Sequence, residues 1–306
     1  MKLKETVTAP IAVLASYILY VICYRTPWVR DALLRNGEYN LLSGIVLELL
    51  ILLIPALLYA KLKGQGYSAK IHFASLRPSG SILAFCILLI ALCGILLIAV
   101  GYVASGIIHS KYLLSETYAM LLPERELSVF LRCMNYAIIP AVGEELLYRG
   151  ILVTELSGGG VGLSIIFSSL LFACSRFDLV SLPVYFFVGL CLSVLFYTTR
   201  SLPLTIITRL ALNLLIFYFE DAAWTLILKR ANFPLLICTA AILLLFAAFL
   251  ALSEAQRLYY LRGMDGEKTP AEWKLTESRK VRLLSLLLSP SFILCLVTFA
   301  LVISLM

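Results

Sequence analysis

Ionisable side chains interrupt an otherwise apolar stretch near the middle of this 306-residue chain. Glu144, Glu145 and Arg149 stand there in the pattern Glu-Glu-x-x-x-Arg. Residues four apart lie on one face of a helix, so Glu145 and Arg149 can pair. Glu144 points about 100° away, toward a different neighbour. Ionised groups at membrane depth are costly and are functional candidates by default, so the two carboxylates are the first place to look for chemistry.

Two later apolar stretches carry polar groups at the same spacing. Phe172 and Arg176 are four residues apart, and so are Arg209 and Asn213. If each stretch is a helix, each presents its polar groups on one face. We therefore expect these side chains to converge with the two glutamates in one buried polar pocket, with at least one ion pair across helices.

The segment from Ala141 to Gly150, which reads AVGEELLYRG, resembles the first signature of the CPBP intramembrane proteases. That family includes the CAAX prenyl endopeptidases and the bacteriocin-self-immunity (Abi) proteins. Its pattern is EExxxR, then FxxxH, then HxxxN on successive membrane helices, and the order and spacing here agree over about 129–220. The resemblance implies catalytic positions at Glu144, Glu145, Arg149 and Asn213, with Glu144 activating a water molecule.

Both histidines of the family pattern are arginine in this chain, at Arg176 and Arg209. Arginine only donates hydrogen bonds, stays protonated and is no metal ligand. The chain's two histidines, His72 and His109, lie outside the matched region. Zinc usually has nitrogen or sulfur ligands, and no histidine or cysteine is placed to supply one. We therefore expect no metal and no other cofactor.

The substitutions leave three functions open. Two glutamates that pair with arginines are poor water activators, which favours a catalytically degenerate family member that acts as a membrane scaffold or regulatory partner. The first alternative is an active glutamate-dependent CAAX-type intramembrane endopeptidase. The second is a lipid- or small-molecule-binding, transporter-like protein whose surplus arginine binds an anionic group.

Composition places these residues in a membrane. Hydrophobic residues make up 61% of the chain and charged residues 14%, which excludes a soluble enzyme and a disordered chain. The formal charge of +7 is typical of a membrane protein, whose cytoplasmic loops carry an excess of Lys and Arg. No basic cluster is interleaved with aromatic residues, as it would be in a nucleic-acid-binding protein. The eight cysteines all fall in apolar stretches without metal or disulfide spacing. We predict an all-α polytopic membrane helix bundle with about eight or nine transmembrane helices.

The predicted helices divide the chain into three parts. N-terminal helices occupy 1–127, a CPBP-type core occupies 128–220, and C-terminal helices occupy 221–306, with a cytoplasmic loop near 254–282. The apolar runs are 8–24, 41–60, 82–108, 129–156, 161–174, 179–198, 202–219, 233–252 and 283–306. In the fourth run we expect Pro140 and Gly143 to kink the helix or divide it. In the second run we expect Glu48 to pair within the bundle or to reach the interface.

Basic residues suggest how the chain lies in the membrane. The loops expected on the same side of the membrane as the N-terminus carry more Lys and Arg than the loops on the opposite side. This predicts a multi-pass protein of the cell membrane with a cytoplasmic N-terminus. The expected partners are membrane lipid and a membrane-protein or membrane-associated enzyme partner, and no nucleic acid.

Overall fold

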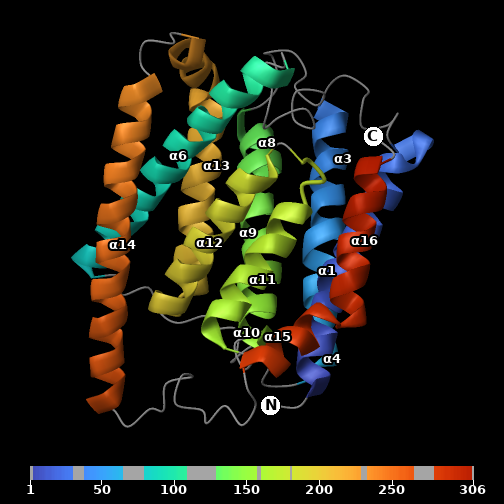
Figure 1. Cartoon of the computed structure of the whole chain (residues 1–306). Helices are drawn as coiled ribbons and strands as arrows, with labels where there is room; N and C mark the ends of the chain where they lie inside the picture. Colours follow the sequence, from blue (N-terminus) through green and yellow to red (C-terminus); the bar gives the residue numbers. More distant parts are fainter. Residues whose placement is uncertain are drawn as a thin grey trace.

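The computed structural model describes residues 3–29, 38–64, 79–108, 129–156, 160–179, 181–228, 233–264 and 279–304. Within these ranges every regular element is a helix, and the helices lie side by side in one bundle (Figure 1). The predicted all-α helix bundle is therefore confirmed. The three-part division of the chain stays a prediction.

The N-terminal helices flank the motif region. They are α1 (Leu3–Arg25), α3 (Glu38–Glu48), the π-helical segment η1 (Leu49–Leu53), α4 (Ile54–Leu62) and α6 (Gly80–Ile108). Ser79 begins α6, because its hydroxyl oxygen accepts the Ile82 N–H at 3.4 Å.

The central helices carry the motifs. The first motif lies on one continuous helical stretch made of α8 (Val129–Cys133), η2 (Met134–Ile138), α9 (Ile139–Glu145), η3 (Leu146–Val153) and α10 (Thr154–Leu156). The others lie on α11 (Val161–Cys174), α12 (Leu182–Thr199) and α13 (Leu202–Leu228). The C-terminal helices are α14 (Phe233–Met264), α15 (Arg279–Leu287) and α16 (Pro290–Ser304).

Two helical stretches of the described chain are long and apolar enough to cross a membrane, Leu42–Lys63 and Leu182–Thr199. Shorter apolar helical segments accompany them: Pro10–Cys23, Gly80–Leu96, Val161–Cys174, Leu202–Tyr218, Cys238–Glu254 and Pro290–Ser304. The first helix begins and the last helix ends at opposite ends of the bundle (Figure 1). The number of spans and their orientation stay predictions.

The core lies between the central helices, and α14 lies at the edge. Leu147, Leu171, Leu192 and Leu212 are fully buried among the motif-bearing helices. By contrast, α14 packs against α6 and α12 and leaves its other side open (Figure 1). Large apolar side chains on that open side include Leu235, Ile242, Leu245, Phe249 and Leu252. Such one-sided packing suits a helix that faces lipid.

Proline widens the motif helix and does not divide it. Pro140 has no N–H, so carbonyls one turn earlier lose their usual partner. The structure widens to π-helix over η2, where the Ile139 N–H bonds the Met134 carbonyl. The same arrangement precedes Pro55, with the Ile54 N–H on the Leu49 carbonyl. The helix is therefore not divided at Pro140 and Gly143, because it accommodates the missing donor in a wider turn, and the predicted kink stays a prediction.

Two helices extend further than the hydropathy predicted. The helix expected over 202–219 continues to Leu228, and the polar stretch expected as a loop over 254–282 is helical at both ends. Specific hydrogen bonds explain why α14 continues beyond Glu254. Glu254 accepts hydrogen bonds from the Ser79 and Ser81 hydroxyls and from Arg257 three residues further on, so a charged residue continues the helix.

Candidate functional site

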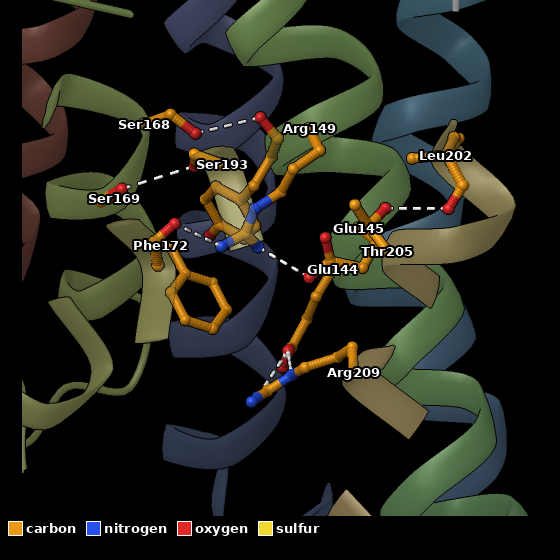
Figure 2. A network of polar contacts seen from close by, with 12 residues as sticks. Glu144, Glu145, Arg149, Ser168, Ser169, Phe172, Ser193, Leu202, Thr205 and Arg209 are labelled. Atoms are coloured by element: carbon orange, nitrogen blue, oxygen red, sulfur yellow. Dashed lines mark hydrogen bonds and ion pairs between the residues drawn. The ribbon is translucent and has the colours of Figure 1, made fainter. Parts of the chain in front are cut away.

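The first motif ends one helix and begins a π-helical segment. Glu144 and Glu145 are the last two residues of α9, and η3 follows directly. Both glutamates are buried, with 3% and 0% of their surface exposed. Figure 2 shows their carboxylates pointing to different neighbours, as their adjacent places on the helix predict. Single π-helical turns are frequent at functional sites.

Glu144 joins three elements through its two oxygens. Its Oε2 accepts hydrogen bonds from Arg209 on α13, from Nε at 3.1 Å and from Nη2 at 2.9 Å (Figure 2). Its Oε1 accepts a hydrogen bond from Arg176 Nη2, in the turn after α11. The expected ion pair across helices is therefore present. Each oxygen of this carboxylate is occupied by a guanidinium.

Glu145 pairs within its own helix, as the spacing predicted. Arg149 Nη1 lies 2.8 Å from Glu145 Oε1, and neither side chain is accessible. The other terminal nitrogen of Arg149 donates to the Gly189 carbonyl on α12 at 3.1 Å. Glycine allows this close approach, because a Cβ there would lie only 3.0 Å from the Ser169 backbone. The close approach of α12 to α11 thus places a carbonyl where Arg149 needs an acceptor.

Phe172 is surrounded by arginines. The guanidinium carbons of Arg149, Arg209 and Arg176 lie 4.6, 5.2 and 5.7 Å from its ring centroid. Arg176 also lies 4.7 Å from the Tyr185 ring centroid. At these distances the negative face of an aromatic ring attracts a cation. The motif includes Phe172 but did not predict that its ring lies among three arginines. The contact of Tyr185 with Arg176 was also not predicted, because no motif includes α12.

The turn that carries Arg176 has a special backbone. Phe177 adopts a left-handed conformation, with φ of 49°. Such a conformation is uncommon for a bulky residue and persists where the surroundings hold it. The Phe177 ring packs against Tyr17 and Tyr20 of α1 and Phe299 of α16, with centroids 5.2, 4.8 and 6.3 Å away. Helices outside the motif region therefore fix the position of Arg176.

Asn213 bonds a backbone carbonyl of the motif helix. Its amide nitrogen donates to the Ala137 carbonyl of η2 at 3.3 Å, one helical turn beyond Arg209. The structure thus gathers Glu144, Glu145, Arg149, Phe172, Arg176 and Arg209, while Asn213 braces the π-helical segment beside them. The catalytic roles that the family pattern implies for Glu144, Glu145, Arg149 and Asn213 stay predictions.

The residues present do not fit a zinc centre. In the described ranges no three or more His, Cys, Asp or Glu side chains lie together. The nitrogen-bearing side chains that contact Glu144 and Glu145 are arginines, which repel a cation. Both His72 and His109 lie outside the described residues. The expectation of no metal and no cofactor stays a prediction.

Two comparisons with known proteins agree with the motif. A family model described as type II CAAX prenyl endopeptidase Rce1-like matches residues 126–215. The membrane-embedded CAAX protease MroQ of Staphylococcus aureus (strain USA300) is 24% identical over 220 residues, which are 70% of this chain and 87% of that protein. No solved structure matches. Motif order, helical fold and both comparisons point the same way: residues 126–215 are similar to the CAAX prenyl endopeptidases, and the longer alignment is to a membrane-embedded CAAX protease.

Proposed function

We propose that this chain is a catalytically degenerate CPBP protein that acts as a scaffold or regulatory partner in the cell membrane. One observation carries the proposal: both oxygens of Glu144 accept hydrogen bonds from arginines. In the family pattern this carboxylate activates water. Here its charge holds helices together.

A general base must offer a free oxygen to the water that it deprotonates. For Glu144 to do so, a guanidinium would have to leave a buried carboxylate. Breaking a buried ion pair by removing one partner costs about 3–5 kcal/mol. The same pairs join α9, α13 and the turn after α11, so displacement of Arg176 or Arg209 would also loosen the bundle.

The proposal extends to how the protein acts. A multi-pass protein with a cytoplasmic N-terminus would present its helices to lipid and to a membrane-protein or membrane-associated enzyme partner. The wide apolar side of α14 supports contact with lipid. The ion pairs would keep the helix arrangement that the partner recognises, without turnover.

Glu144→Gln tests this proposal, because it keeps the size of the side chain and removes the charge. The melting temperature in detergent should fall, and wild-type protein should not cleave a prenylated CAAX peptide. Glu155→Gln is the matched control. Glu155 pairs with Lys63, with 3.1 Å between Oε2 and Nζ, at a place outside the motif where Lys63 is 25% exposed. Robust wild-type cleavage, lost in a Glu144→Gln variant that melts like the wild type, would refute the scaffold proposal.

Active endopeptidase is the second candidate, and the comparisons favour it. The family model and MroQ are both described as CAAX proteases, and the likeness to MroQ extends well beyond the motifs. Under this alternative Glu144 releases one arginine when substrate binds. The same measurement separates the two candidates, because a catalytic carboxylate is dispensable for stability but not for cleavage.

A further inference from the structure

We infer that Tyr17 on α1 is a positioning residue of the motif site, which keeps Arg176 on Glu144 by holding both sides of the turn after α11. Tyr17 lies outside residues 126–215, the part of the chain that the family model matches. The inference goes beyond the proposed function, because it concerns what places Arg176 on Glu144 and holds whether or not Glu144 takes part in cleavage.

Tyr17 contacts the chain both before and after Arg176. Its hydroxyl donates a hydrogen bond to the Leu171 carbonyl in the last turn of α11. Its ring meets the Phe177 ring edge-on, with 5.2 Å between the centroids and 67° between the ring planes. Tyr17 and Phe177 are both 1% exposed, so both contacts lie in the interior of the bundle. One side chain of α1 therefore brackets the residue that pairs with Glu144.

Arg176 depends on its turn more than the other two arginines of the network depend on neighbouring elements. Arg149 and Arg209 project from within helices, whereas Arg176 lies beyond the end of α11. Its backbone is placed by the turn, where its N–H donates to the Ala173 carbonyl at 3.2 Å. Its side chain is also 18% exposed, against 0% for Arg149 and 2% for Arg209. Arg176 is therefore the arginine that a shift of the turn would move away from Glu144.

The left-handed backbone at Phe177 depends on the rings around it. A φ of 49° is unfavourable for a bulky residue unless its surroundings hold it there. Tyr17 and Tyr20 of α1 and Phe299 of α16 supply those surroundings. Because α1 packs along α16 (Figure 1), the turn is held where these two helices meet. A change in how α1 packs against α16 would therefore reach Arg176 through Phe177.

Arginine labelling of the full-length protein in detergent tests the inference. Phenylglyoxal adds to a guanidinium that solvent can reach, and mass spectrometry follows each arginine separately. Tyr17→Phe removes only the hydroxyl and should speed the labelling of Arg176 by roughly two- to tenfold, the factor that corresponds to one net hydrogen bond. Arg149 and Arg209 should stay unlabelled in the same sample, because the rest of the bundle is intact. Tyr136→Phe is the matched control and should leave Arg176 unchanged, since Tyr136 is also buried but packs against Phe217, with 5.9 Å between the ring centroids.

A double-mutant cycle adds a second measurement. Phe177→Leu should lower the melting temperature less in an Arg176→Gln background, because the ion pair that the turn positions is already gone. Phe292→Leu is the control and should have the same effect in both backgrounds, since the Phe292 ring packs against Phe167 at 4.9 Å and not against the turn.

The inference is overturned if Arg176 is labelled no faster in Tyr17→Phe than in the wild type, or if all three arginines of the network become labelled together. It is also overturned if Phe177→Leu has the same effect with and without Arg176. The labelling of Tyr17→Phe decides alone if Phe177→Leu does not fold. Neither measurement depends on peptide cleavage, so a failure here is distinct from a failure of the proposed function.

Discussion

Two polar clusters join helices in this molecule, and water reaches them to different degrees. The central network is the set Glu144, Glu145, Arg149, Arg176 and Arg209 together with the Phe172 ring between them (Figure 2). The edge cluster joins α6 to α14 through Ser79, Ser81, Glu254 and Arg257. Arg257 is 47% exposed, whereas Arg149 is not exposed at all.

This difference in exposure determines how much each cluster contributes to the stability of the bundle. At the edge, two serine hydroxyls and the half-exposed Arg257 share the stabilisation of the buried Glu254, so the loss of one partner should cost little. In the centre, the partners of each charge are fixed side chains and one backbone carbonyl. Removing any of them leaves a charge that nothing else can solvate. The central network therefore determines stability, while the edge cluster mainly determines where α14 docks.

The largest effect is expected for Arg149→Met, which breaks the central network. Glu145 would lose its cationic partner in an inaccessible place, and the Gly189 carbonyl would lose its donor. We expect a loss of about 3–5 kcal/mol in the free energy of unfolding, measured by thermal melting in detergent. Arg257→Met is the matched change at the edge and should cost less than about 1 kcal/mol. Equal losses in the two variants would remove the contrast between the clusters.

A smaller effect is expected for Phe172→Leu, which keeps every charge of the network but removes the ring between the arginines. The matched control is Phe167→Leu, because Phe167 is also buried but packs against another aromatic ring, Phe292, at 4.9 Å. Both variants lose similar apolar contact. The melting temperature of Phe172→Leu should fall further, by an amount that corresponds to about 0.5–2 kcal/mol of cation–π attraction. If the melting temperature of Phe167→Leu falls as far, the Phe172 ring does not stabilise the arginines.

The smallest effect is expected for Glu254→Gln in the edge cluster. An amide can still accept from Ser79 and Ser81, and Arg257 can turn to water, so the loss should stay below about 1 kcal/mol. Adding salt should shrink this difference, because Arg257, the ion-pair partner of the buried Glu254, is 47% exposed and therefore screened. The loss in Glu144→Gln should respond less to salt, since Glu144 and Arg209 are almost fully buried and Arg176 is only 18% exposed. Melting curves for both variants at low and high salt test this pair of expectations.

Spacing and hydropathy predicted much of the fold and part of the site. The helix over Val161–Cys174 begins and ends as the sequence indicated, because Gly160 precedes the apolar run and the polar Ser175 follows it. The pairing of Glu145 with Arg149 followed from their spacing, and the match of two arginines to the remaining glutamate followed from charge. These features depend on local periodicity or on strong electrostatic need.

Other features depend on contacts that no local pattern encodes. The three arginines around Phe172 come from three separate elements, so only the tertiary fold brings them together. The continuation of α14 beyond Glu254 depends on two serines almost at the start of α6. The hydrogen bond from Asn213 to the carbonyl of Ala137, in the widened turn before Pro140, likewise depends on the packing of α13 against η2.

The widened turn at Leu49–Leu53 has a consequence for the length of the chain. A π-helical turn holds one residue more than an α-helical turn, yet the helices on both sides keep their facing. Deleting one residue there would restore an ordinary turn and leave Gly44 and Pro55 on the faces they now occupy. The same deletion inside α11 would rotate everything beyond it by about 100° and turn Arg176 away from Glu144. Relatives of different length should therefore gain or lose single residues within such turns, in the middle of membrane helices, as well as in the loops.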